Sequence, residues 1–289
     1  MCYYNGQIVS RTEVIRLKNL EKKYDGNFMK SPLQIGFDFG TTAVLKRTPG
    51  EEDFDIVAME WGFMKGDPTQ WPYLRTREDV AKVRQGYNDS SGKFVPGLNF
   101  LNAVSEELLL PNKVYREAAL NRRCLVLSSG FYEWRHVYPT HKKTGQPLKT
   151  AVKYPYRIYL PEKEYFFMAG VWEPWTDQAT GEHVDSVAIV TTKANKLMDI
   201  VHNAKRRMPT ILNEDLAHEW LFGTLDEKVI NTIAATQCPY QEMDAYTLQK
   251  DFRLALDPTE PFKYDGIAEK VSLELARPTL SQKDLFSAN

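Results

Sequence analysis

The second residue of the chain is a cysteine, and this position gives it two nucleophiles on adjacent carbon atoms. A small second residue permits removal of Met1, which would leave the α-amine and the thiol of Cys2 together at the amino terminus. In model compounds these groups titrate at about pH 8 and about pH 8.5, so both are partly reactive at neutral pH. The amine can form a Schiff base with an aldehyde, and the thiol can then close on the imine carbon to give a thiazolidine. The alternative is a second codon without a function.

Three further polar residues lie in or beside apolar segments, where an unpartnered polar group is costly. Glu133 stands among aromatic residues in GFYEW, and burial there would raise its pKa and suit it to proton transfer. His202 precedes a basic cluster, and histidine is the natural acid or base at neutral pH. Asn102 is an amide in an apolar run that could orient a reacting group. Each of the three, taken singly, could instead be a structural polar residue with ordinary partners.

The elements that position these residues follow from the apolar pattern. The segments IVAMEWGF, RCLVLSSGFYEW, YRIYLPEKEYFFMAGVWEPW and SVAIVTTKA are rich in Val, Ile and aromatic residues and are bounded by turns, which predicts strands. The capping-box spacing of Ser10 and Glu13, followed by one apolar face in EVIRLKNLEKKYD, predicts a helix that ends before Gly26. Further helices are predicted after Pro111, in EDLAHEWLF with Asn213 as its cap, and in DEKVINTIAATQ.

The composition and the spacing of these elements predict one main domain. The 289 residues are 43% hydrophobic, which is ample for a packed core and excludes a wholly disordered chain. A basic loop between Trp134 and Tyr154 is typical of a long hairpin connection that protrudes from a sheet. We predict an α+β fold over residues 1–256, with a largely antiparallel, barrel-like sheet and peripheral helices. Residues 257–289, where periodicity fades, are predicted to be a flexible C-terminal extension.

Charge and cysteine content limit the partners and the compartment. Lys and Arg number 37 against 38 Asp and Glu, for a net charge of −1, which excludes a globally basic nucleic-acid coat but permits a local basic groove. Three cysteines cannot form a disulfide framework, so we expect Cys124 and Cys238 to be structural and the protein to be cytoplasmic. No segment has the pattern of a membrane span, a secretory signal, a zinc site or a nucleotide-binding loop, and we expect no cofactor.

Several of these segments occur in an order that resembles the SRAP family, the SOS response-associated peptidase group. The order runs Met1-Cys2, WGF, LNAVSEE, RRCLVLSSGFYEW, MAGVWEPW and IVTTKAN…IVHNAKRRMP, and it covers residues 1–222. The resemblance implies a protein that shields abasic sites in single-stranded DNA through a covalent bond to its N-terminal cysteine. It also implies lyase behaviour, because a Schiff base at an abasic site invites β-elimination, and an autoproteolytic removal of residues before the cysteine.

The resemblance also assigns roles to the four candidate residues. Cys2 would be the nucleophile, and Asn102 would hold its α-amine and the forming ring. Glu133 would act as the general base or acid at the amine, and His202 as the acid that helps to open the deoxyribose ring. Three functions remain open: an abasic-site sensor that acts as a monomer, an N-terminal-nucleophile hydrolase of peptides or amides, and a non-catalytic DNA-binding member of the same fold.

This sequence departs from the family pattern at positions where DNA phosphates would be bound. Many members continue the cysteine with Gly-Arg, whereas this chain has Tyr3 and Tyr4. Val104 stands where an arginine usually follows the active-site asparagine by two places. GFDFGTT, at residues 36–42, is the nearest counterpart by position of an Asn-Val-Ala-Pro-Gly-like segment. The replacements remove two expected phosphate contacts and leave the covalent chemistry in place.

Other residues could bind a single strand, for which backbone charge and base stacking provide most of the affinity. Trp61 is predicted to be the stacking residue. The basic candidates lie beside a site residue or on the protruding loop, and they are Arg122, Arg123, Lys142, Lys143, Lys205, Arg206 and Arg207. The alternatives are solvated surface charges and a core tryptophan.

The last segment carries one more pattern. Residues 282–286, QKDLF, resemble the short pentapeptide by which bacterial repair proteins dock on the replication sliding clamp. In that mode Leu285 and Phe286 would enter an apolar pocket while Gln282 provides a polar anchor. The alternative is a chance match, since five-residue patterns are common.

Overall fold

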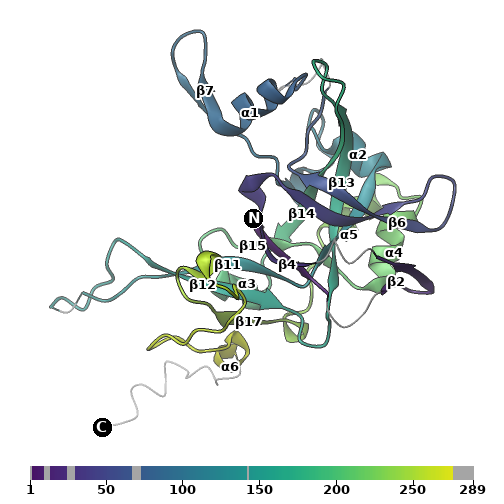
Figure 1. The fold of residues 1–289 in the computed structure, drawn as a ribbon. Coiled ribbons are helices and arrows are strands. Elements are labelled where there is room, and N and C mark those ends of the chain that lie inside the picture. Colours follow the sequence, from purple (N-terminus) through teal and green to yellow (C-terminus); the bar gives the residue numbers. More distant parts are fainter. Residues whose placement is uncertain (1, 10–13, 25–29, 67–72, 142, 276–289) are drawn as a thin grey trace.

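Five strands of the structure close into a barrel (Figure 1). A computed structural model describes residues 2–9, 14–24, 30–66, 73–141 and 143–275. The ring order is β14 (His183–Lys193), β6 (Phe54–Trp61), β5 (Thr41–Arg47), β10 (Arg123–Ser128) and β13 (Phe166–Thr176), which pairs back with β14. The β6–β14 pair is parallel and the other four pairs are antiparallel. Closure pairs every strand of the ring on both sides.

A second, five-stranded antiparallel sheet packs against the barrel. Its order is β17 (Asp244–Thr247), β12 (Val152–Tyr159), β11 (Gly130–Val137), β1 (Tyr4–Ile8) and β4 (Lys30–Ile35). Barrel residues such as Val126 and Met168 meet Phe131 and Ile158 of this sheet in one buried cluster, which also contains Cys2. The N-terminal strand therefore lies inside a sheet, between β11 and β4.

Short elements attached to β13 and β14 position two of the four candidate catalytic residues. These elements are β9 (Asn102–Val104), β15 (Arg207–Pro209), β16 (Ile211–Leu212) and α3 (Lys196–Val201). β9 lies parallel to β14 and places Asn102 opposite Ile189. The side chain of Asn195 caps α3, which ends at His202. Asn102 and His202 are thus fixed to the same barrel strand from its two sides.

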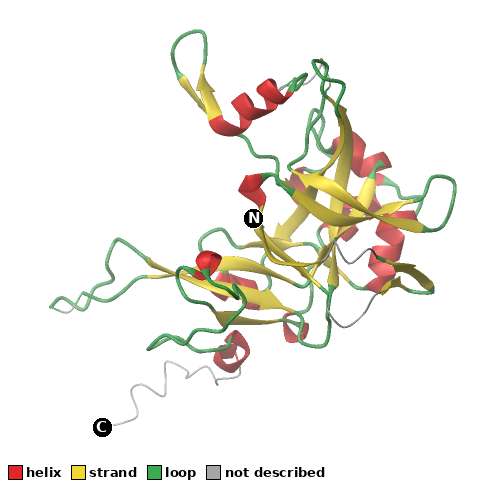
Figure 2. Cartoon of the chain, in the orientation of Figure 1, coloured by secondary structure: helices red, strands yellow, loops and turns green. Residues whose placement is uncertain are grey.

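Helices surround the sheets, as Figure 2 shows. They are α1 (Arg77–Gln85), α2 (Arg116–Asn121), α4 (Glu214–Phe222), α5 (Glu227–Ala234) and α6 (Val271–Leu275), with 3-10 turns η1 (Gly36–Asp38), η2 (Ser105–Glu107), η3 (Tyr240–Glu242) and η4 (Phe252–Leu254). A hairpin of β7 (Gly86–Asn88) and β8 (Phe94–Pro96) projects beyond α1 (Figure 1). Among the described residues no helix has the length and apolar character needed to cross a bilayer.

The predicted fold class is confirmed, with one large local exception. The helix predicted from Ser10 is wrong over its described part, because β2 (Val14–Leu17) and β3 (Leu20–Lys23) form an antiparallel hairpin. Ile15 and Leu17 alternate along β2 and are fully buried in the barrel cluster, so a period of two prevails over the helical spacing. Ser10 and Glu13 lie outside the described residues. The helices after Pro111, at EDLAHEWLF and at DEKVINTIA are confirmed, as are the strands.

The segment after residue 256 continues along the second sheet. The N–H of Phe262 donates to Thr247 O at 2.8 Å, and Ser272 bonds to the carboxylate of Asp244. Val271 is fully buried. The domain division at residue 257 remains a prediction, but residues 257–275 contact β17 and its neighbours.

Arg123 ties two helices to the barrel. Its guanidinium donates to Ala119 O and Leu120 O at the end of α2, and to Trp220 O and Gly223 O at the end of α4, at 2.6–3.1 Å. Helix C-termini leave carbonyl groups without intrahelical partners, and these contacts satisfy four of them. The DNA contact expected at Arg123 stays a prediction, and in the structure its donors serve the fold.

The guanidinium of Arg122 also binds groups within the protein. Its guanidinium donates to Glu117 Oε1 and Glu173 Oε2, each at 2.6 Å, and its side chain is largely buried. Charge-assisted bonds of this length are among the stronger ones in proteins. The DNA contact expected at Arg122 likewise stays a prediction, and in the structure its guanidinium binds carboxylates of the protein.

Replacement of Arg123 should weaken the fold. Arg123→Ala leaves four carbonyl oxygens without their donor, and we expect a loss of about 3 kcal/mol in the free energy of unfolding. Urea denaturation measures the loss. Arg206→Ala is the matched control, because its side chain is mostly exposed, and it should change stability by less than about 0.5 kcal/mol. Equal stabilities of the two variants would contradict this role of Arg123.

Candidate active site

Cys2 and Asn102 hold each other by reciprocal hydrogen bonds. The N–H of Cys2 donates to Asn102 Oδ1 at 3.0 Å, and Asn102 Nδ2 donates to Cys2 O at 2.9 Å. The hydroxyl of Tyr115 donates to the backbone oxygen of Asn102 at 3.1 Å, so the asparagine is anchored from behind. The nitrogen that would become the α-amine is thereby fixed at an amide oxygen. The neighbouring thiol, fully buried, lies 3.7 Å from Tyr4 O.

Glu133 and His202 form the second part of the site. Glu133 Oε2 lies 3.5 Å from His202 Nε2, and both side chains are less than one-tenth exposed. His202 Nδ1 lies 2.8 Å from the backbone oxygen of Arg207. A carbonyl oxygen can only accept, so Nδ1 carries the proton, and in the neutral ring Nε2 presents its lone pair to Glu133. The backbone of Arg207 thus selects the tautomer of His202.

Burial sets the protonation states of this pair. Burial raises the pKa of Glu133 to about 8, and it lowers the pKa of His202 to about 4. At neutral pH the carboxyl group is therefore protonated and the imidazole is uncharged, a pair without net charge that costs least to bury. Burial, and then the charge of Glu133, raise the pKa of the Cys2 thiol, which links Cys2 electrostatically to Glu133. The site therefore holds one proton on the Glu133 carboxyl group, another on the Cys2 thiol, and a basic nitrogen at His202 Nε2.

Asn203, which the sequence analysis did not single out, clamps the two halves of this pair. Its Oδ1 accepts from the N–H of His136 at 2.9 Å, and its Nδ2 donates to His136 O at 2.8 Å. His136 lies on β11 three residues after Glu133, and Asn203 directly follows His202. The clamp sets the separation of Glu133 and His202. An amide side chain next to a candidate histidine, at a helix end, was the available signal in the sequence.

The guanidinium of Arg207 binds groups within the protein. Its guanidinium donates to Glu106 Oε1 at 2.7 Å and to Thr191 O at 2.5 Å, and this contact lowers the pKa of Glu106 to about 2. Its role as a DNA contact stays a prediction, and in the structure its carbonyl oxygen orients His202. Arg206 and Lys205 are exposed on the same turn, where Arg206 has a left-handed φ of 52°.

Trp61 is a core residue in this structure. Its side chain is 2% exposed, and its indole N–H donates to Leu101 O at 3.0 Å. Base stacking on Trp61 stays a prediction; in the structure the apolar pattern of β6 directs this ring into the buried cluster that also contains Leu101. Trp61 supports the backbone directly before Asn102.

The remaining candidates lie on the surface or outside the described residues. Lys143 is exposed on the loop between β11 and β12, and Lys142 lies outside the described residues. The clamp-like peptide with Gln282, Leu285 and Phe286 also lies outside them. Cys124 and Cys238 are buried and unpaired by disulfides. Within the described ranges, no group of three or more His, Cys, Asp or Glu side chains has an arrangement that could hold a metal ion.

The fold and these side chains define a class of protein: a barrel-based body that encloses Cys2, near the start of the chain, beside an asparagine, a glutamate and a histidine. Residues 20–253 match the family model described as SOS response associated peptidase (SRAP), and the chain belongs to this family. Asn102, Glu133 and His202 lie within the matched residues, and Cys2 precedes them.

Named relatives agree with this assignment. The chain is similar to the abasic site processing protein YoqW of Bacillus subtilis (strain 168), with 34% identity over 125 residues, or 43% of this chain and 49% of YoqW. It is 30% identical over 183 residues to the abasic site processing protein YoaM of the same organism, covering 59% and 72%. The abasic site processing protein HMCES of Xenopus tropicalis is 24% identical over 225 residues, covering 71% and 57%. The matched region thus spans about half the length of YoqW and of HMCES.

Solved structures show the same fold. A protein from Bacteroides thetaiotaomicron superposes with a TM-score of 0.64 and 25% identity, over 90% of this chain and 97% of that one. A protein from Bordetella bronchiseptica superposes with a TM-score of 0.57 and 16% identity, over 86% and 100%.

The raised pKa of Glu133 predicts a pH-dependent cost to the fold. Between about pH 4.5 and about pH 8 the folded protein keeps a proton on Glu133 that the unfolded chain releases, so this group lowers stability as pH rises. Glu133→Gln removes the titration, and its stability relative to wild type should rise by about 3 kcal/mol between pH 5 and pH 8. Urea unfolding at both pH values measures this change. A difference that does not vary with pH would contradict the assignment.

Loss of the Asn203 clamp should release His202. In Asn203→Ala the turn can move away from β11, water can reach the ring, and we expect the pKa of His202 to rise from about 4 toward about 6.5. NMR titration of the imidazole measures it. Asn213→Ala is the matched control, because it removes one helix cap for a comparable loss of stability and leaves the His202 titration unchanged. An unchanged titration in Asn203→Ala would show that the clamp does not position His202.

Proposed function

We propose that this protein processes abasic sites in single-stranded DNA by forming a covalent thiazolidine between Cys2 and the deoxyribose aldehyde, after removal of Met1. The observation that carries the proposal is the reciprocal pair of hydrogen bonds between Cys2 and Asn102, beside the buried Glu133–His202 pair. The names of the relatives, abasic site processing proteins, support the choice of substrate. The four residues supply every group that the reaction needs.

Opening of the abasic sugar is the first step. The closed deoxyribose is a hemiacetal, and its opening requires one proton to reach the ring oxygen and another to leave the C1 hydroxyl. Protonated Glu133 gives its proton to the adjacent His202 Nε2, and His202 then protonates the ring oxygen, which makes His202 the acid of this step. The carboxylate left on Glu133 accepts the proton of the C1 hydroxyl, so Glu133 ends the step protonated again. The product is the open-chain aldehyde.

The covalent steps follow at Cys2. The α-amine attacks the aldehyde carbon, and loss of one water gives the imine; Asn102 Oδ1 accepts an N–H of the amine and directs its lone pair. The thiol sulfur then bonds to the imine carbon, the π electrons move to nitrogen, and the thiol proton ends on that nitrogen. A thiol whose pKa is raised by burial keeps this proton until the ring closes. The sequence releases one water and consumes no oxidant or reductant.

Lyase and autopeptidase activities belong to the same proposal. At the imine stage a base can remove a proton from the deoxyribose C2 carbon, which breaks the strand by β-elimination, whereas ring closure protects it. Hydrolysis of the Met1–Cys2 peptide bond would expose the amine. The exposed cations Lys143, Lys205 and Arg206 would bind phosphates, so affinity should fall as salt rises.

Substitutions at Cys2 separate the imine from the closed ring. Wild type should give a shifted band with an abasic oligonucleotide on a denaturing gel without any reductant. Cys2→Ser keeps the amine and lacks the thiol, so its band should appear only after borohydride trapping, with at least about tenfold less adduct otherwise. Cys238→Ala, a buried cysteine elsewhere, is the control and should behave as wild type. If Cys2→Ser matched wild type without borohydride, or if wild type gave no band, the proposal would be wrong.

A further inference from the structure

Two aromatic rings, the half-buried Tyr3 and the exposed Phe37, form a pair directly beside Cys2. The ring centroids of Tyr3 and Phe37 are 4.8 Å apart, with an interplanar angle of 39°. Phe37 lies on η1 and is 47% exposed, so part of its ring is accessible to a ligand. The N–H of Gly36 donates to Tyr3 O at 2.8 Å, which fixes η1 to the residue that follows the nucleophile.

The backbone under this pair is strained and braced. Phe39, at the end of η1, has a left-handed φ of 51°, which is costly for a bulky residue and tends to persist only at sites with a role. The guanidinium of Arg84 lies 3.7 Å from the centroid of the Phe39 ring. Arg84 reaches η1 from α1, a separate part of the chain, so the strained turn is held from outside.

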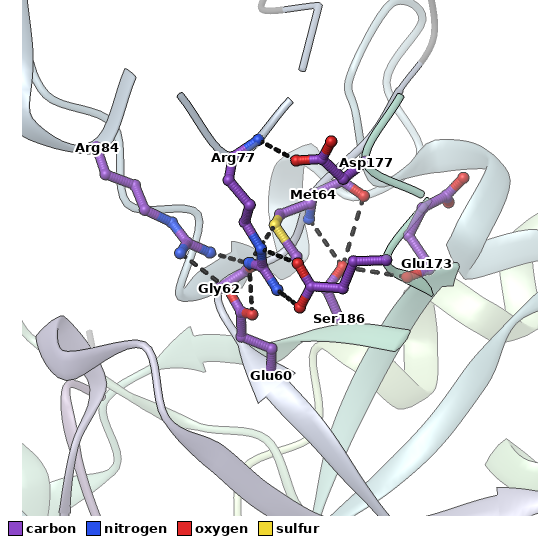
Figure 3. A network of polar contacts seen from close by, with 9 residues as sticks. Glu60, Gly62, Met64, Arg77, Arg84, Glu173, Asp177 and Ser186 are labelled. Atoms are coloured by element: carbon purple, nitrogen blue, oxygen red, sulfur yellow. Dashed lines mark hydrogen bonds and ion pairs between the residues drawn. The ribbon is translucent and has the colours of Figure 1, made fainter. Parts of the chain in front are cut away.

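Figure 3 shows how Arg84 is itself held. Its guanidinium donates to Gly62 O at 3.0 Å and lies 2.9 Å from Glu60 Oε1, while Arg77 binds the other oxygen of Glu60 at 2.7 Å. A Cβ atom on Gly62 would lie 2.8 Å from both Arg84 and Phe39, so only glycine permits this approach. The buried carboxylate of Glu60 thus makes the brace rigid.

The pair is also connected to the asparagine that holds Cys2. The hydroxyl of Tyr3 is hydrogen-bonded to the side chain of Asn99. Asn99 Oδ1 accepts from the N–H of Leu101, which directly precedes Asn102. A ligand on the Tyr3–Phe37 pair would therefore contact a residue that directly follows Cys2. Through Asn99, the same residue is connected to the backbone that directly precedes Asn102.

We propose that Phe37, supported by Tyr3, is the platform on which the nucleobase next to the abasic site stacks. This inference rests on the proposed function and names a further part of its substrate. An abasic nucleotide has no base to stack, so its neighbours must set its position, and aromatic rings accept any base. Trp61, the stacking residue expected from sequence, is buried, whereas Phe37 is exposed. The specificity that follows is for an abasic site with an intact neighbouring base.

The test varies the neighbour and the ring together. Oligonucleotides carry one abasic site whose neighbour is either adenine or a baseless tetrahydrofuran spacer, placed on the 5′ side in one series and on the 3′ side in another. Cross-linking under subsaturating single-turnover conditions should be about tenfold faster with adenine in one of the two series. Phe37→Ala should remove this preference, and Phe37→Trp should keep it. Retention of the preference in Phe37→Ala, or its absence in wild type, would overturn the inference.

Two controls separate the platform from the chemistry and from general surface effects. Phe262→Ala removes a phenylalanine that is 45% exposed and bonded to β17, the opposite edge of the sheet from β4 and η1, and it should keep the preference. Wild type and Phe37→Ala should form an adduct with glyoxylate, a small aldehyde, at equal rates by intact mass. Unequal rates with glyoxylate would show that Phe37 acts on the chemistry and would overturn its assignment as a platform.

A binding measurement keeps the platform testable if the covalent proposal fails. An oligonucleotide with tetrahydrofuran at the abasic position cannot form an imine, so fluorescence anisotropy reports stacking alone. Affinity should be about tenfold higher with an adenine neighbour, and Phe37→Ala should abolish the difference. Equal affinities in wild type would overturn the platform, whatever the cross-linking result. Absence of any Cys2 adduct together with this affinity difference would instead contradict only the proposed covalent chemistry.

Discussion

The paired hydrogen bonds between Cys2 and Asn102 are the contact on which the site depends. The first residues of a chain usually fray, because few contacts repay the entropy of ordering them. Here β1 lies between two strands, and Cys2 is held at both its nitrogen and its oxygen by one side chain. Asn102 can do this because β9 is fixed in register on the barrel strand β14. The closed barrel therefore serves to bring a fixed amide to a chain end.

Burial has two consequences at Glu133 and His202 that oppose each other. Desolvation keeps the carboxyl protonated and the imidazole neutral, which is the state that can pass a proton to and from a substrate. The same desolvation lowers the stability of the fold in the pH ranges where the unfolded chain would ionise these groups. The positions of the two groups must then be enforced by other contacts, and the Asn203 clamp and the Arg207 carbonyl supply them. The two large buried apolar clusters, one of which lies between the barrel and the second sheet, offset this loss of stability.

Local signals in the sequence predicted much of the fold and selected candidate residues that the structure brings together, whereas contacts between distant segments left no local signal. Asn213 before EDLAHEWLF and Glu133 among aromatic residues are informative because each signal lies within a few residues. The N-terminal hairpin was mistaken for a helix because its apolar residues fit both periods, and only burial in the barrel decides between them. The acceptors of Arg123 lie at the ends of two helices, one of them about a hundred residues away in sequence. No local pattern reveals such a partner, and the same holds for the burial of Trp61.

The use of arginines inside the fold changes what holds a DNA strand. Three guanidinium groups donate their hydrogen bonds to carbonyl and carboxylate groups of the protein, those of Arg122, Arg123 and Arg207. With a net charge of −1, backbone attraction from the remaining surface cations is modest and salt-dependent. Under the proposed function, retention on DNA would then come from contacts that salt screens little. The proposed covalent bond at Cys2 would be one such contact and the proposed stacking on Phe37 another, since neither requires a counter-charge. The replacements at Tyr3, Tyr4 and Val104 are consistent with a site that binds less through phosphates and more through bases.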